Sequence, residues 1–212
     1  MRLFSSESVT AGHPDKLCDC ISDAILDACL TADPYARVAV ETFVKGLDPD
    51  GRDPPHSFIV IGGEITLAEG CSIDYEDIAR RTAADIGYTS MDVGMDATSE
   101  KNCEVTVLVS QQSEDISRGV TEGKGLFTEQ GAGDQGIMFG FAANESEAYP
   151  SLVGSYMPLP ILIAQRLTTA LSEAGKNGIL EWARPDGKSQ VTVAYDEHGI
   201  PQYVDTVVIA IQ

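Results

Sequence analysis

The feature that most constrains the fold is a change in apolar spacing that follows a Gly-His-Pro-Asp-Lys cluster at residues 12–16. Residues 16–32 place apolar side chains at helical intervals, and Asp33-Pro34 ends that pattern. Residues 36–44 then alternate and are rich in β-branched side chains, which is typical of a strand. The start of the chain therefore predicts a helix followed directly by a strand.

The rest of the first half extends this pattern. Residues 57–65 and 103–109 are expected strands, and residues 73–86 are an expected amphipathic helix closed by Gly87. The Gly62-Gly63 pair inside the first of these strands predicts a bulge or a close backbone approach. We therefore predict an α+β layer, in which helices cover one face of a sheet.

The second half predicts another layer of strands and a helix. The helix is expected near residues 157–174, and residues 190–196 and 203–211 are expected to form a hairpin around Glu197-His198-Gly199. The apolar strand that ends at Gln212 predicts that the chain continues or that another chain completes the sheet.

Polar segments without apolar periodicity separate these layers. The sequence predicts an N-terminal α+β domain over 1–111, a mobile loop over 112–130 and an incomplete central α+β domain over 131–212. A second polar loop, rich in Pro and Gly, covers 47–57.

The charge balance limits the classes of partner. Thirty-three acidic and 14 basic residues give a net charge of −19, which argues against nucleic-acid binding through a basic surface. A polyphosphate site in such a chain has to concentrate its few cations, use metal ions or take cations from another chain.

The expected location is the cytoplasm. No run approaches the roughly 18 apolar residues of a membrane span, and the N-terminus lacks the apolar stretch of a signal peptide. Five cysteines, an odd number without a disulfide-framework spacing, favour a reducing compartment.

The 12–16 cluster has residue types suited to a bound phosphate. Pro14 falls at a first helical position, so His13 and Asp15 lie at a helix N-terminus, where backbone N–H groups favour anions. Histidine could bond a phosphate oxygen, aspartate suits Mg²⁺, and lysine neutralises phosphate. An ordinary helix N-terminus with charged capping residues would also explain this sequence.

Other candidate positions are individually weak. Asp134, in the glycine loop GAGDQG at 131–136, has room to meet a ligand amine or a metal, although a tight turn explains the loop equally well. Asp186 and Lys188 flank a glycine just before a strand, where lysine suits a phosphate oxygen and turn chemistry alone also suffices. Glu41, Glu64 and Gln112 could simply face solvent.

Taken in order, the segments FSSESVTAGHPDK, RVAVETFVKG, IGGEIT, QQSEDI, EQGAGDQGIMFGFA and RPDGKSQVT resemble the S-adenosylmethionine synthetase family. The resemblance runs from about Phe4 to Gln212, and GHPDK together with GAGDQG is highly specific to that family. It implies repeated sheet-plus-helix layers with a pseudo-threefold repeat, of which the third is missing here. It also implies joining of ATP and L-methionine: the methionine sulfur attacks C5′ and displaces triphosphate, which is then hydrolysed.

The resemblance also implies roles for individual positions. By resemblance, His13 contacts the ATP triphosphate, and Asp186, Gly187 and Lys188 form an ATP-binding segment. Glu64 and Gln112 contact methionine, and Asp134 faces the substrates in the active site. Asp15 is the Mg²⁺ ligand and Glu41 the K⁺ ligand. The stretch from Gln112 to about Thr128 resembles a gating loop. Family members form the site between two subunits, so the expected assembly is a homodimer or homotetramer.

Two departures from the family pattern bear on activity. The 47–57 loop looks like a surface insertion, and the family pattern goes on beyond Gln212 with lysines, an arginine and aspartates that hold triphosphate and metal. The chain is thus expected to be part of a normal synthetase. The alternatives are a catalytically silent binding or assembly partner and, more weakly, a different ATP-using enzyme on the same scaffold.

Overall fold

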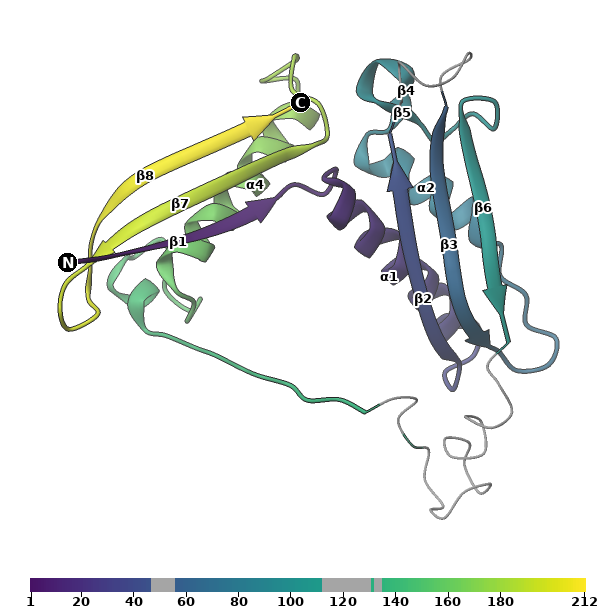
Figure 1. Ribbon diagram of the computed structural model, residues 1–212, viewed down its shortest axis with the longest axis horizontal. Coiled ribbons are helices and arrows are strands. Elements are labelled where there is room, and N and C mark those ends of the chain that lie inside the picture. Colours follow the sequence, from purple (N-terminus) through teal and green to yellow (C-terminus); the bar gives the residue numbers. More distant parts are fainter. Residues whose placement is uncertain (47–55, 112–130, 132–134) are drawn as a thin grey trace. The chain divides into compact units, whose positions relative to one another are not determined.

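The computed structural model describes residues 1–46, 56–111, 131 and 135–212, and it divides into two compact units. One unit combines Met1–Lys16 with Phe139–Gln212, and the other is Leu17–Met138. Both units have a sheet with helix packed on it (Figure 1), so the α+β prediction is confirmed.

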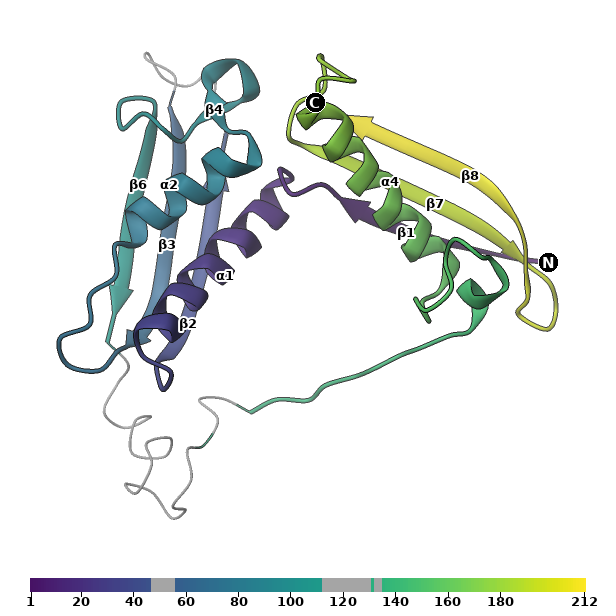
Figure 2. The same cartoon turned by 180° about the vertical axis from the view of Figure 1, so that it is seen from behind.

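The Leu17–Met138 unit is built on a three-stranded sheet in the order β2-β3-β6. Strand β3 (Ser57–Thr66) runs antiparallel to β2 (Arg37–Lys45) and parallel to β6 (Cys103–Ser110). Figure 2 shows helix α1 (Pro14–Ala32) and helix α2 (Tyr75–Ile86) against one face of this sheet. The short strands β4 (Thr89–Ser90) and β5 (Met95–Asp96) pair beside it, joined through a 3₁₀ turn, η1 (Met91–Val93).

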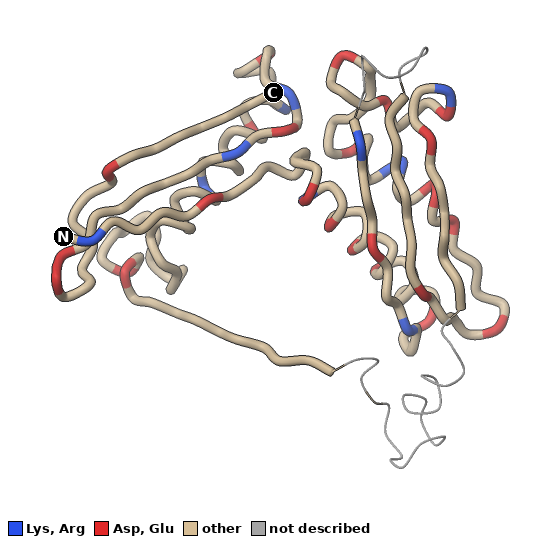
Figure 3. Tube along the Cα trace, in the orientation of Figure 1, with Lys and Arg blue, Asp and Glu red and all other residues tan. Residues whose placement is uncertain are grey.

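Apolar residues at helical and alternating spacing meet in the core between these layers. Ile21 and Ile25 of α1 and Ile59 and Ile61 of β3 are all fully buried. Acidic residues recur along α1 (Figure 3), and of these Asp19, Asp23 and Asp27 are exposed. Helix α1 begins at Pro14, the residue predicted for its first position, and its apolar face covers the sheet.

The second unit has an antiparallel sheet in the order β1-β7-β8, formed by β1 (Arg2–Val9), β7 (Gly187–Tyr195) and β8 (Pro201–Ile211). Helix α4 (Leu159–Lys176) packs on β1 and β7, and the 3₁₀ turn η2 (Glu145–Ala148) precedes it. Leu159, Ala164, Val191 and Val193 form the core between helix and sheet. The predicted β7–β8 hairpin is confirmed.

Strand β1 was not predicted, and it changes how the chain is divided in space. Strand β1 pairs with β7 along its whole length, from Arg2 opposite Tyr195 to Val9 opposite Lys188. Backbone pairing across about 180 residues of sequence therefore groups the first 16 residues with the C-terminal segment.

Gly63 confirms the predicted close backbone approach. Its φ is 137°, and a Cβ there would lie 2.1 Å from the carbonyl oxygen of Ala39 on the neighbouring strand. The β2–β3 register continues through this position without a bulge. Among the helices of the described ranges, none has the length and apolarity needed to cross a membrane.

Candidate active site

Thr10 joins the two segments that carry most of the predicted ATP-contacting residues. Its backbone N–H donates to Gly187 O at 2.9 Å, and its Oγ1 donates to Pro185 O at 2.7 Å. On the other side, the His13 N–H donates to Thr10 O at 3.1 Å. Thr10 itself is only 4% exposed, and its bond to Pro185 O is part-buried.

Gly12 lets the same two segments approach closely. A Cβ at this position would lie 2.4 Å from the carbonyl carbon and oxygen of Pro185, closer than real Cβ contacts occur. Any larger residue would therefore push the turn before α1 away from Pro185. The close approach at Gly12 is therefore between two segments of the chain itself.

His13 and Asp15 lie together at the start of α1. The backbone N–H of Asp15 donates to His13 Nδ1 at 3.3 Å, which assigns the proton of a neutral ring to Nε2. The same Nδ1 is 3.9 Å from Asp15 Oδ2, too far for a hydrogen bond, so the backbone contact determines the assignment. The His13 side chain is 25% exposed and that of Asp15 is 91% exposed. An imidazole N–H and a solvated carboxylate therefore share one helix N-terminus.

Lys188 lies on the face of sheet β1-β7-β8 that α4 leaves open. Its Nζ is 2.5 Å from Glu7 Oε2, and the Gln190 side-chain amide donates to Glu7 Oε1 at 3.0 Å. Glu7 and Gln190 lie directly opposite each other in the β1–β7 ladder. Glu7 of β1 therefore holds the Lys188 ammonium, and Gln190 of β7 orients the Glu7 carboxylate.

The predicted methionine and potassium residues of the other unit share one sheet face. Glu41 of β2 lies opposite Gly62, and Glu64 of β3 lies two residues further along on the same side. The next residue, Thr42, faces α1 and bonds Ser22, so Glu41 points away from the helices. Glu41 is exposed and Glu64 half-buried.

Two predicted site residues, Gln112 and Asp134, lie outside the described residues, as does the expected gating loop. Where the structure does describe side chains, no group of three or more His, Cys, Asp or Glu could hold a metal ion. Asp15 nevertheless fits a nucleotide-borne Mg²⁺, because such an ion needs one or two protein carboxylates and takes its other ligands from phosphate and water. Glu41 likewise offers a single solvated carboxylate to a cation.

A cavity of about 600 Å³ lies at the other end of the β1–β7 ladder. Its lining includes Phe4, Glu145, Tyr195 and His198, and none of the predicted site residues. The Tyr195 hydroxyl donates to Glu145 Oε2 at 2.8 Å, and burial followed by this bond raises the pKa of the phenol. Since Glu145 also accepts the Leu159 N–H at the start of α4, this carboxylate joins the hairpin to the helix.

Comparison with known proteins decides the family. The model of the S-adenosylmethionine synthetase N-terminal domain matches residues 1–114, and that of the central domain of the same enzyme matches residues 129–212. The chain belongs to the S-adenosylmethionine synthetase family. Its resemblance to that family is therefore confirmed over both halves of the sequence.

Individual S-adenosylmethionine synthases are similar along nearly the whole chain. The Syntrophobacter fumaroxidans enzyme is 49% identical over 210 residues, which are 99% of this chain and 48% of that protein. The Desulfosudis oleivorans enzyme is 50% identical over the same shares, and the Corynebacterium efficiens enzyme is 46% identical over 100% of this chain and 49% of its own length. The chain spans about half the length of the curated relatives it matches.

Two residues of this candidate site were missed by sequence reasoning. Thr10 and Glu7 both stand in the serine-rich segment before GHPDK, where nothing in their local spacing indicates a role. Their partners, Pro185 and Lys188, are more than 170 residues away. The only signal that could have found them is the pairing of β1 with β7, which the sequence did not indicate.

Proposed function

We propose that this chain takes part in synthesis of S-adenosylmethionine from ATP and L-methionine. In this reaction the methionine sulfur attacks C5′ of ATP, the C5′–O bond breaks, and triphosphate leaves before its hydrolysis to phosphate and pyrophosphate. The observation that carries the proposal is the contact between the GHPDK and RPDGK segments through Thr10 and Gly12.

The first step of this reaction requires stabilisation of the leaving triphosphate and does not require a general base. A thioether is already nucleophilic, so the barrier depends on aligning sulfur with C5′ and on neutralising the charge that grows on triphosphate. In the proposal, His13 donates Nε2–H to a triphosphate oxygen, Lys188 adds a positive charge, and the Asp186–Gly187 backbone positions the nucleotide. Glu64 and Gln112 are proposed to bind methionine, and Asp134 to face the substrates.

The proposed cofactors are Mg²⁺ and K⁺. Mg²⁺ bound with ATP would neutralise part of the triphosphate charge. Asp15 would hold it through one carboxylate oxygen, and Glu41 would hold K⁺ in the same way. In a chain with a net charge of −19, such cations offset the repulsion between protein and nucleotide.

The proposed assembly is a homodimer or homotetramer with the active site at the subunit interface, and the proposed location is the cytoplasm. The assembly is supported by apolar side chains on the open sheet faces, where Phe43 is 62% and Leu108 64% exposed. The location is supported by the cysteines, all five of which lie in the described ranges without forming a disulfide.

A second candidate is a catalytically silent binding or assembly partner of a full-length synthetase. The observation that favours it is length, because the chain covers only 48% to 49% of the three relatives named above. Such a chain would keep the ATP-contacting segments and the sheet faces while another chain supplied the remaining cations.

One experiment separates the two candidates. The chain is incubated with ATP, L-methionine, Mg²⁺ and K⁺, and S-adenosylmethionine is measured by mass spectrometry. Product from the chain alone supports the enzyme, and its absence, with ATP binding retained, supports the silent partner. His13→Ala should lower product formation by roughly 100-fold or more, because a donor to the leaving group is lost. His198→Ala, in the exposed hairpin turn, is the control, and an equal rate for His13→Ala and the wild type would refute the His13 assignment.

A further inference from the structure

We propose that Thr10 is a positioning residue that sets the separation between the His13 turn and the Asp186–Lys188 segment, and so controls affinity for a triphosphate. This inference rests on the proposed function, since it concerns how the same site is held in place. Thr10 contacts neither segment's charged groups, and it acts through the backbone of both.

Thr10 is bonded on three sides. Its N–H and Oγ1 hold Gly187 O and Pro185 O, and a weaker contact of 3.3 Å runs from Oγ1 to Gly187 O. Its carbonyl accepts the His13 N–H. One buried residue thereby bonds the backbone on both sides of the proposed triphosphate site.

Packing fixes the distance that these bonds define. A Cβ on Gly187 would lie 3.1 Å from Thr10 Cγ2 and 3.0 Å from Leu171 Cδ2, so the Thr10 methyl already fills the space beside Gly187. From the far side, the Gln212 N–H donates to Asp186 O at 3.1 Å. The segment that carries Lys188 is therefore clamped between Thr10 and the end of β8.

The Thr10 hydroxyl is the part of this arrangement that can be removed without changing shape. Valine has nearly the size and branching of threonine but cannot donate to Pro185 O, so the half-buried Pro185 carbonyl would lose this bond. Serine keeps the donor and loses the methyl. Thr10→Val should therefore loosen the two segments, and Thr10→Ser should largely preserve them.

The chain offers a matched control in the same unit. Thr168 of α4 is also 4% exposed, and its hydroxyl bonds Ser8 Oγ of β1 at 3.0 Å, away from the His13 turn. Thr168→Val removes a hydroxyl of equal burial that joins β1 to another element. It should lower stability to a similar extent without changing triphosphate binding.

The test is calorimetric titration of the 212-residue chain with tripolyphosphate and Mg²⁺. Thr10→Val should weaken binding by roughly three- to tenfold, the effect of one net hydrogen bond, while Thr10→Ser and Thr168→Val stay within about twofold of the wild type. Equal weakening by Thr10→Val and Thr168→Val would overturn the proposal, because it would show that stability alone governs binding.

Amide hydrogen exchange tests the positioning independently of any ligand. Thr10→Val should speed exchange at both the His13 and Gln212 amides, which report the two segments, and Thr168→Val should not. Unchanged exchange at these amides refutes the role of Thr10. Wild-type chain that shows no tripolyphosphate binding, with exchange altered as expected, instead refutes the proposed function of the site.

Discussion

The ion pair between Glu7 and Lys188 shows how a residue can matter to a site while contributing little to folding. Both side chains are more than 40% exposed, so water screens their attraction and the pair adds at most about 1 kcal/mol to stability. Its effect is local, because Gln190 orients the Glu7 carboxylate toward the ammonium. Lys188 is thereby held on the open sheet face beside the proposed triphosphate site.

Glu7→Gln should therefore leave the unfolding free energy within about 1 kcal/mol of the wild type. It should also make the Lys188 amine more reactive toward acetylation, because Lys188 loses its carboxylate partner. The measurement is competitive acetylation followed by peptide mass spectrometry, with exposed Lys101 as the internal reference. Asp77→Asn, which removes the partner of exposed Arg81 in the other unit, is the control. A Lys188 acetylation rate unchanged by Glu7→Gln would show that the pair does not hold the lysine.

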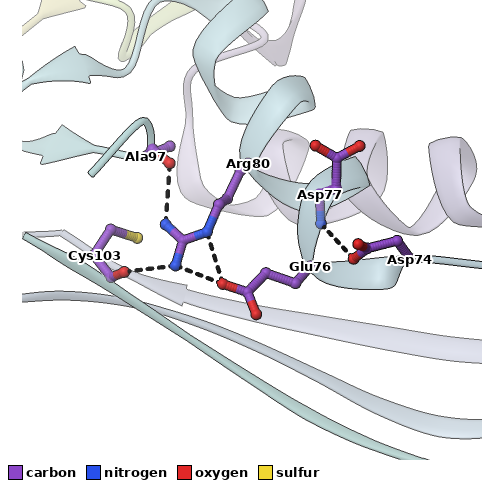
Figure 4. Close-up of polar contacts among 6 residues, drawn as sticks. All are labelled: Asp74, Glu76, Asp77, Arg80, Ala97 and Cys103. Atoms are coloured by element: carbon purple, nitrogen blue, oxygen red, sulfur yellow. Dashed lines mark hydrogen bonds and ion pairs between the residues drawn. The ribbon is translucent and has the colours of Figure 1, made fainter. Parts of the chain in front are cut away.

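At the scale of elements, Arg80 connects α2 to the strands beside it (Figure 4). Its guanidinium donates to Ala97 O and Cys103 O, each at 3.1 Å, and to Glu76 Oε1 at 2.8 Å. The side chain is only 15% exposed. Two of these bonds tie the helix to Ala97, just after β5, and to Cys103, the first residue of β6, while the bond to Glu76 stays within α2.

Arg80→Met should lower the unfolding free energy by about 2–3 kcal/mol, because it leaves two carbonyls without a donor. Arg81→Met, one residue along, removes only an ion pair that is 69% exposed on the arginine side and should cost under about 1 kcal/mol. Urea unfolding followed by circular dichroism compares the two variants. Equal losses of unfolding free energy in the two variants would mean that the Arg80 hydrogen bonds stabilise the fold no more than an exposed ion pair does.

Glu147 stabilises the loop before α4 in a way that depends on pH. The Gly154 N–H, together with the N–H of Tyr156 and the Ser146 hydroxyl, holds the pKa of its carboxyl below the ordinary value of 4.5. The contribution to stability is therefore present at neutral pH and is lost as the pH falls through the lowered pKa. An NMR titration of the Gly154 and Tyr156 amides should give a midpoint below 4.5, and a midpoint at or above that value would contradict it.

The elements differ in how far sequence could predict them. Helix α1 and strands β2 and β3 were predicted because local spacing sorts their residues into buried and exposed faces. Strand β1, RLFSSESV, has three serines and few β-branched residues, and pairing with β7 is what makes it a strand. His13 and Lys188 could be proposed from residue type, whereas the Thr10 bonds that unite their segments depend on that same distant pairing.

At the scale of the whole molecule, each unit has a sheet with one face covered by helix and one face open. On the open faces, Phe43 and Leu108 belong to the β2-β3-β6 sheet, and Leu3 and Val208 to the β1-β7-β8 sheet, each between 48% and 64% exposed. A chain with a net charge of −19 has ample charge to cover such faces, yet these positions are apolar. A second copy of the chain is the occupant that the proposed assembly implies.

Sedimentation equilibrium should accordingly give a mass at least twice the 22.6 kDa of one chain. Phe43→Lys should shift this association toward monomer, because it places a charge in the apolar face that has to be desolvated on contact. Tyr35→Lys is the matched control, since Tyr35 is 74% exposed in the turn after α1 and its substitution changes the net charge by the same amount. A concentration-independent monomer for the wild-type chain would exclude association through these faces, and equal effects of the two variants would assign the association to net charge instead.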